Sequence, residues 1–228
     1  MKDLLKKIPG ITWLADIFNS IIIIIKYSIG FNVKIQDERA DPKDPEWDNN
    51  PWAMVFEKRC NYAKNYSVNK DVLDLCCGTG WTTFEISKIC NSIIGVDSSE
   101  NTIQCAKSNY MRENISFKKM NALSLRFQEN TFDTVVSMEA IEHFTKSDGI
   151  QFILEAYRVL KKGGIFIGST PQTENRNPLK LFALKKIDPF HLYLYSKSSR
   201  VNFNSAYGVY IPRLYSSNNV VHGTVSHG

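Results

Sequence analysis

Five short apolar segments alternate with stretches of helical periodicity between residues 72 and 169. Each apolar segment has the length of a buried strand, and the intervening stretches repeat apolar residues at helical spacing. Strands that alternate with helices in this way form a parallel sheet with helices on both faces. The pattern therefore predicts a doubly wound α/β domain. The expected strands are 72–76, 93–96, 115–118, 132–138 and 165–169, and the expected helices are 54–66, 82–89, 102–110 and 151–160.

The chain changes character outside this region, which indicates four parts. Residues 1–35 form an apolar segment with helical spacing, and residues 36–53 form an acidic linker with three prolines. The α/β domain is expected at 54–200. Residues 201–228 have little helical periodicity, so we expect an atypical and partly disordered C-terminal segment.

The N-terminal part contains an amphipathic stretch at residues 11–31. Asp16 and Lys26 interrupt it, so no uncharged run reaches the roughly 18 residues of a membrane-spanning helix. No small-residue cleavage site follows the apolar run, so we expect no cleavable signal peptide. Apolar side chains lie on one face of the stretch and polar ones on another. The stretch can therefore pack on the protein's own body or lie on a membrane surface.

Charge and cysteine content narrow the classes of function. Lys and Arg number 28 against 23 Asp and Glu, yet residues 51–175 carry fourteen of each, so the excess lies at the ends. A neutral centre lacks the basic footprint of a nucleic-acid-binding domain. The five cysteines form no CxxC pair and no zinc-type spacing. We therefore expect reduced thiols, a cytoplasmic location and no metal site.

The first expected strand leads into an acid and a glycine loop. Asp74 lies near the carboxyl end of the strand, and the loop reads Cys77-Gly78-Thr79-Gly80. Glycines let a ligand approach the backbone at a helix start, but the dinucleotide pattern needs a third glycine where Thr83 stands. A carboxylate here would repel a diphosphate by about 4 kcal/mol for unit charges 4 Å apart near a surface, and it suits a cationic ligand. Asp74 could instead be a structural acid that caps the loop.

A second acid ends the second expected strand. Asp97 follows the apolar run at 93–96 and lies 23 positions after Asp74. In doubly wound folds an acid at this place reaches the ribose hydroxyls of an adenosine-containing cofactor. The competing interpretation is that Asp97 merely caps the next helix.

On these residues the sequence resembles the class I S-adenosylmethionine (SAM)-dependent methyltransferases. The resemblance runs over residues 56–195. It implies a Rossmann-like, mostly parallel methyltransferase sheet with helices on both faces, and SAM as the cofactor. The matching segments are 72–80 and 95–98 for two cofactor motifs, 121–125 for the adenine side, 132–144 for the fourth strand and its active-site end, and 158–164 for the turn into the fifth strand.

The resemblance also implies roles for individual side chains. Asp74 would lie near the methionine end of SAM, and Asp97 would accept from both ribose hydroxyls. Asn121 replaces the usual acid, but its amide oxygen can still accept the adenine N–H; it could also be an ordinary turn residue. Arg59 or Tyr62 could close over the SAM carboxylate, or have plain surface or packing roles. The expected cofactor-binding residues are Asp74, Cys76, Gly78, Gly80, Asp97, Ser98, Asn121, Ala122 and Met138.

Two histidines are the candidate catalytic residues. A hydroxyl or acidic-carbon acceptor benefits from a general base, and imidazole titrates near neutrality. His143 lies just past the fourth strand, although it could simply begin a helix. His191 is the second candidate, with packing among neighbouring aromatic side chains as the alternative.

The expected acceptor is a small molecule, such as a glycan, a sugar phosphate or a lipid-linked intermediate. The basic stretch that follows the fifth strand, including Lys185 and Lys186, favours an anionic acceptor, although it could be a solvated face. Residues 137–140 lack the Asn/Asp-Pro-Pro-aromatic motif of base N-methylation, so we expect no nucleic-acid partner. The alternatives are a non-enzymatic SAM-binding or adaptor protein with a degenerate fold and, third, an RNA methyltransferase. Membrane association would come through residues 11–31.

Overall fold

The structure is a computed structural model that describes residues 41–45, 47–49 and 53–170, and the backbone of 220–224. The amphipathic stretch at 11–31, His191 and the basic stretch with Lys185 and Lys186 lie outside these residues. None of the helices in the described part is long and apolar enough to cross a membrane.

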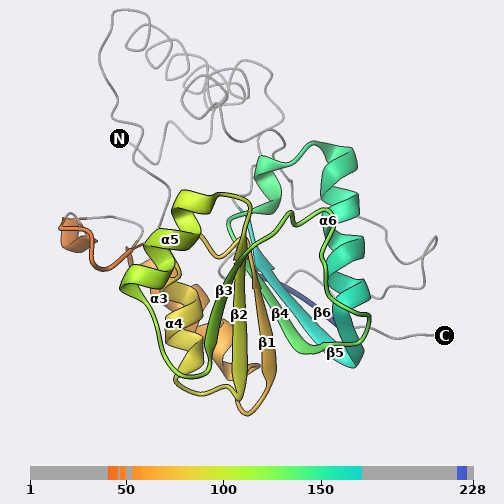
Figure 1. The fold of residues 1–228 in the computed structure, drawn as a ribbon, viewed down its shortest axis with the longest axis horizontal. Helices are drawn as coiled ribbons and strands as arrows, with labels where there is room; N and C mark the ends of the chain where they lie inside the picture. The colour runs from red at the N-terminus through yellow and green to blue at the C-terminus, as the bar shows by residue number, and fades with distance from the viewer. Residues whose placement is uncertain (1–40, 46, 50–52, 171–219, 225–228) are drawn as a thin grey trace, which may run out of the picture.

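Six strands form one sheet in the order β3-β2-β1-β4-β5-β6 (Figure 1). Strands β1 to β5 run parallel, and β6 runs antiparallel to β5. The predicted doubly wound, mostly parallel sheet is therefore confirmed. The chain winds outward from β1 to β3 and then returns to the other side of β1, which leaves a crevice at the carboxyl ends of β1 and β4. The strands are β1 (Asp71–Leu75), β2 (Ser92–Asp97), β3 (Ile115–Lys119), β4 (Phe132–Met138), β5 (Leu160–Ser169) and β6 (Val220–Thr224).

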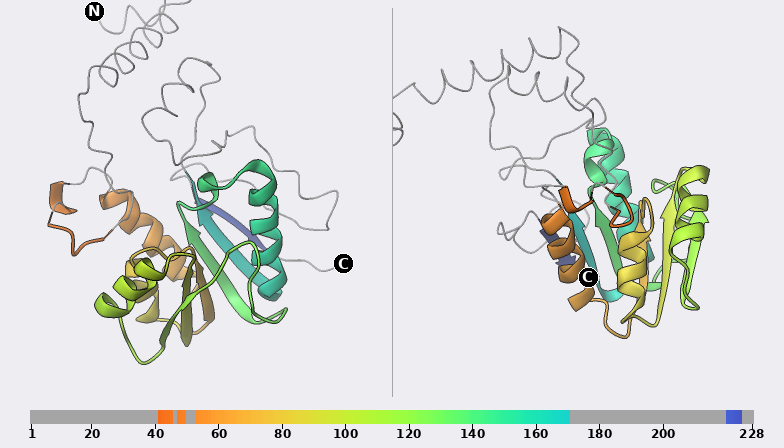
Figure 2. Two further views of the ribbon diagram at one scale, coloured as in Figure 1. Left: turned by 45° about the horizontal axis from the view of Figure 1, so that its top comes forward. Right: turned by 90° about the vertical axis from the view of Figure 1, so that its left-hand side faces the viewer.

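Helices cover both faces of the sheet, as Figures 1 and 2 show. The helices α3, α4 and α5 pack on one face, and α6 packs on the other. Side chains alternate along β1, so Val72 joins the first layer of the core and Leu73 joins the second. The helices are α3 (Ala53–Asn65), α4 (Trp81–Ser87), α5 (Glu100–Asn109) and α6 (Lys146–Val159), with short 3₁₀ turns η1 (Trp47–Asn49) and η2 (Ile141–His143).

Helix α6 begins five residues before the predicted start at residue 151. Thr145 caps it, because its hydroxyl oxygen accepts the backbone N–H of Asp148 at 3.2 Å. Apolar periodicity could not place this start, since the first turn is polar and is held by the cap rather than by burial.

Part of the predicted acidic linker packs on the domain. The Trp47 ring is 9% exposed and lies 5.5 Å from the Trp81 ring and 6.3 Å from the Phe56 ring, measured between centroids. The Tyr110 hydroxyl at the end of α5 donates to Asp41. The described part of residues 41–49 therefore packs on the domain through Trp47 and Asp41.

A strand forms within the C-terminal segment that we expected to be atypical and partly disordered. Val220–Thr224 pairs with β5 along the whole register from Ser169 to Ile165. The two adjacent valines are followed by His222 and Gly223, so the local sequence shows neither an apolar run nor an alternating pattern. The strand forms because its backbone groups pair with those at the edge of β5.

Candidate functional site

A pocket of about 380 Å³ opens at the carboxyl ends of β1, β2 and β4. This is the crevice at which doubly wound sheets bind their ligands. Its walls come from the loop between β1 and α4, from the end of β2, from the segment after β4, and from one side of α3. The lining residues are Phe56, Arg59, Asp74, Cys76, Cys77, Gly78, Thr79, Trp81, Thr82, Asp97, Ser98, Met138, Glu139, Ala140, His143 and Phe144.

The loop between β1 and α4 contains three left-handed backbone positions. Cys76 has φ 63°, Gly78 has φ 54° and Gly80 has φ 88°. Glycine adopts this region without strain, whereas a cysteine there carries a steric cost. A Cβ built on Gly78 would meet no atom within 4 Å, so the space above this glycine is open. The backbone at Gly78 is therefore accessible to a ligand.

The expected ligand contact at Gly80 is not supported by the structure. Gly80 is buried at the start of α4, and a Cβ there would lie 2.8 Å from Phe117 Cζ and 2.9 Å from Ala106 Cβ. It does not line the pocket. The close packing of α4 against β3 and α5 therefore explains by itself why glycine stands at this position.

Asp74 is buried at the base of the pocket. Its carboxylate is held by Thr83, whose hydroxyl donates to Oδ2 at 2.6 Å. Burial raises the pKa of Asp74 from 3.8 to about 7, the Thr83 hydrogen bond opposes this shift, and the negative charge of Asp97 adds to it. Among the described residues no cation pairs with this carboxylate. Thr83 also explains the missing third glycine, since a glycine there could not donate.

Asp97 organises the turn after β2. Its Oδ1 accepts the N–H of Ser99 at 2.9 Å, and its Oδ2 accepts the N–H of Gly78 at 3.3 Å. The cap of α5 is Ser99, whose side chain accepts the N–H of Thr102 at 3.3 Å. Each carboxylate oxygen of Asp97 can therefore accept a further hydrogen bond, and Asp97 lines the pocket. The interpretation of Asp97 as a mere helix cap is wrong.

An ion pair connects α3 to the end of β4 inside the pocket. Arg59 is 5% exposed, and its Nη1 lies 2.9 Å from Glu139 Oε1. The Ser169 hydroxyl donates to the same oxygen at 2.7 Å. Glu139 has a left-handed backbone with φ 49°, which directs it off the strand end. Arg59 Nε is buried and has no hydrogen-bond partner among the described residues, and the Arg59 side chain lines the pocket.

The pocket brings together most of the residues expected from the sequence, but not all. Asp74, Cys76, Gly78, Asp97, Ser98, Met138 and the candidate base His143 all line it. Asn121 and Ala122 do not. Asn121 is exposed, and its amide oxygen accepts the N–H of Leu123 at 2.9 Å, as in an ordinary turn. Its expected contact with adenine stays a prediction.

The sequence left several parts of the pocket unassigned. No pattern connects Arg59 to Glu139, because they stand eighty positions apart. The aromatic walls Phe56, Trp81 and Phe144 carry no signal that separates them from core residues. Arg59 is the one informative residue of this group. A positive charge on the packed face of a helix needs a buried anion as its partner.

The family model described as a methyltransferase domain matches residues 72–164. These residues contain the glycine loop, both acids and the strand end that form the pocket. The matched segment is a class I methyltransferase domain. SAM is the cofactor of this family, and the open backbone at Gly78 between two carboxylates fits a ligand that carries cationic groups and a ribose.

Individual relatives agree with this assignment. A probable SAM-dependent methyltransferase of Mycolicibacterium smegmatis is 31% identical over 142 residues, which cover 62% of this chain and 52% of that protein. A demethylmenaquinone methyltransferase of Lactococcus lactis is 38% identical over 99 residues, which cover 41% and 38%. The chain thus spans about half or less of the length of these relatives.

A solved structure supports the fold of this methyltransferase. A Bacillus halodurans protein assigned to the methyltransferases superimposes with a TM-score of 0.61 at 21% sequence identity. The superposition covers 68% of this chain and 69% of the other. At this identity the likeness shows the fold alone.

Proposed function

We propose that this protein transfers the methyl group of SAM to a small-molecule acceptor. One observation carries the proposal. Asp74 and Asp97 end adjacent parallel strands and flank an open glycine in the same pocket. Two carboxylates without a cationic partner in the described part of the pocket suit a ligand with a cationic end and a sugar diol, and they disfavour a dinucleotide.

The pocket residues would each hold a different part of the cofactor. The second lone pairs of Asp97 would accept the two ribose hydroxyls. Asp74 would lie near the α-ammonium group, whose charge favours the ionised carboxylate. Arg59, which lines the pocket, would attract the carboxylate of the methionine end with its guanidinium charge. The three contacts together would fix the direction in which the methyl group points.

The chemistry requires alignment more than activation. SAM, when bound, would supply an electrophilic methyl group on a sulfonium that leaves as a neutral thioether. Met138 and His143 line the pocket beside the end of β4, where the acceptor must approach. His143 would take the proton that a hydroxyl or carbon acceptor releases. The pocket walls would hold the two reacting atoms in line, which supplies much of the acceleration in such reactions.

The pocket wall favours an acceptor with an apolar portion. Phe56, Trp81 and Phe144 line it together with the Met138 side chain. Of the acceptor classes that the sequence suggests, a lipid-linked intermediate fits such a wall better than a free glycan. The Lactococcus lactis relative, a demethylmenaquinone methyltransferase by name, points in the same direction. The anionic portion of the acceptor would meet the basic stretch with Lys185 and Lys186. We also propose a cytoplasmic location, since all five cysteines are free thiols.

Calorimetry with SAM tests the proposal first. Binding in the micromolar range is expected, and absence of binding would refute the proposed function. Methyl-labelled SAM incubated with fractionated cell extract then identifies the acceptor pool. Transfer into a lipid fraction supports the acceptor class, and transfer into a water-soluble fraction refutes it. SAM binding without any transfer would instead support the non-enzymatic alternative.

A further inference from the structure

The connection between β3 and β4 has no regular structure of its own. Residues 120–131, here called the β3–β4 segment, contain neither helix nor strand. The segment nevertheless contributes buried apolar side chains to the core, among them Ala122 and Leu125, each 6% exposed. A segment that is ordered but irregular must satisfy its backbone groups with partners from elsewhere.

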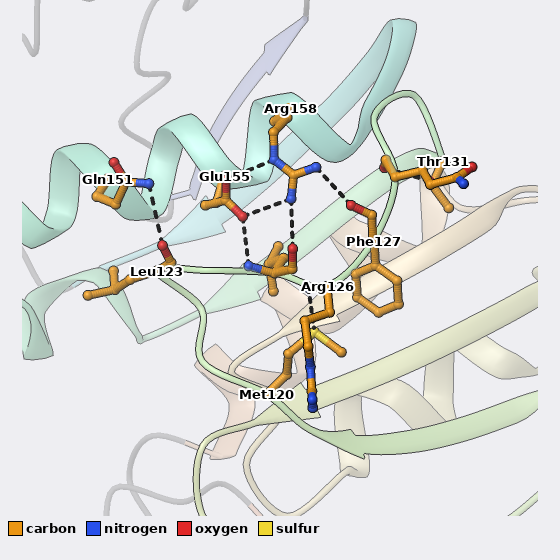
Figure 3. A network of polar contacts seen from close by, with 10 residues as sticks. Met120, Leu123, Arg126, Phe127, Thr131, Gln151, Glu155 and Arg158 are labelled. Carbon is orange, nitrogen blue, oxygen red and sulfur yellow. Dashed lines mark hydrogen bonds and ion pairs between the residues drawn. The ribbon is translucent and has the colours of Figure 1, made fainter.

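Two charged side chains of α6 supply these partners, as Figure 3 shows. Arg158 donates from Nη1 to the carbonyl of Phe127 and from Nη2 to the carbonyl of Leu125, both at 2.8 Å. Glu155 Oε2 accepts the N–H of Leu125 at 2.7 Å. One turn earlier, Gln151 Nε2 donates to the carbonyl of Leu123 at 3.4 Å.

Glu155 and Arg158 also hold each other in place. Arg158 Nε lies 2.8 Å from Glu155 Oε1, and its Nη2 lies 2.9 Å from Oε2. The hydrogen bonds from Arg158 keep the pKa of Glu155 below its ordinary value, so the carboxylate stays charged. The planar guanidinium is thereby fixed in an orientation that reaches two carbonyls at once. A lysine could offer only a point charge in its place.

The β3–β4 segment begins at the candidate site. The N–H of Met120 donates to the carbonyl of Asp97 at 2.9 Å, so the segment starts beside the end of β2. A ribose held by Asp97 would place its base over the neighbouring strand end, which is the end of β3. The backbone that follows β3 would then form the floor under the base.

We propose that Glu155 and Arg158 are positioning residues, which hold the β3–β4 segment in the conformation that receives the adenine ring. The inference rests on the proposed function. The pair lies on α6 and contacts no residue of the pocket, so it sets the affinity for SAM without a part in the chemical step. The loss of its contacts leaves the β3–β4 segment with several conformations, of which few accept the base.

The test compares Arg158→Lys with a matched control, Lys161→Gln. Lys161 bridges Asp71 and Asp133 at the amino ends of β1 and β4, away from the pocket, at 3.4 and 3.0 Å. We expect Arg158→Lys to raise the Kd for SAM on the order of tenfold, with kcat at saturating SAM within about twofold of the unaltered protein. Lys161→Gln should lower Tm to a similar degree and leave the Kd unchanged.

A double variant separates positioning from general destabilisation. If Arg158 acts through the β3–β4 segment, Asn121→Ala should weaken SAM binding less in the Arg158→Lys background than in the unaltered protein. A Kd for Arg158→Lys that matches the control, or effects that simply add, would overturn the inference while SAM binding itself still supports the proposed function. No SAM binding by the unaltered protein would overturn both. Glu155→Gln, which removes the charge and keeps the shape, gives the same test if Arg158→Lys does not fold.

Discussion

The buried carboxylate of Asp74 should lower the free energy of unfolding and raise the affinity for the cofactor. Asp74→Asn removes the charge and keeps an oxygen that can accept the Thr83 hydroxyl. We therefore expect this variant to be more stable than the unaltered protein at pH 8 and to bind SAM more weakly. The two effects have opposite signs, which a general defect in folding could not produce.

The magnitude follows from the pKa of Asp74 in the two states. Because the folded pKa is raised from 3.8 to about 7, folding takes up a proton between these values. The unaltered protein therefore loses stability as pH rises through this window, and the loss is complete above the folded pKa. A shift of this size corresponds to about 4 kcal/mol at pH 8 and about 2 kcal/mol at pH 5. Burial of the asparagine amide costs about 1–3 kcal/mol at either pH.

Denaturant unfolding at the two pH values isolates the electrostatic part. The stability gain of Asp74→Asn over the unaltered protein should be larger at pH 8 than at pH 5 by roughly 2–3 kcal/mol. Asp133→Asn serves as a control that should lose the same stability at pH 5 and at pH 8, because a carboxyl with a lowered pKa is ionised at both values in the folded and the unfolded protein. The backbone N–H of Asp71 and the Lys161 ammonium outweigh partial burial and hold the pKa of Asp133 below its ordinary value. An equal gain for Asp74→Asn at both pH values, or unchanged SAM affinity, would refute the reasoning.

Substitutions at four further positions probe the glycine loop and the helix that follows it. Gly80→Ala should destabilise the protein by about 2–4 kcal/mol, because its Cβ would press on Phe117 at a left-handed position. Gly78→Ala should cost only about 1 kcal/mol of stability and yet lose more SAM affinity; the reverse ranking by denaturation and calorimetry would contradict the assignment. Thr83→Val should move the midpoint of the pH dependence of SAM binding to higher pH, whereas Thr83→Ser should leave it in place. Cys76→Gly should raise the unfolding free energy by about 1 kcal/mol, as measured in denaturant, since it relieves a left-handed cysteine.

The sheet could be predicted because its signals are local. Each buried strand is a mostly apolar run; Asp74 lies near the carboxyl end of the first run, and Asp97 directly follows the second. The parallel arrangement then places both acids at one edge without any knowledge of packing. The strand at 220–224 could not be predicted, because two valines followed by His222 and Gly223 form neither an apolar run nor an alternating pattern, and only the pairing with β5 defines the strand.

Contacts between side chains on different elements could not be predicted either, because the sequence does not show which residues are neighbours in the fold. Thr83 looks like a failed glycine motif until Asp74 is seen 2.6 Å away. Gly80 looks like a ligand-binding glycine until Phe117 is seen above it. In both cases the residue type was informative, but its partner lies on another element and decides the meaning.

These partners explain how the site can be specific for a cation without a built-in counter-charge. Asp74 is held by a neutral hydroxyl, and Asp97 is held by two backbone N–H groups, so neither carboxylate is neutralised by a charged residue of the described part. Arg59, the cation nearest to this role, is engaged by Glu139 at 2.9 Å. A positively charged ligand can therefore interact with two carboxylates that are fixed in place by neutral donors. The same two carboxylates would repel the negative charges of a diphosphate and so disfavour a dinucleotide.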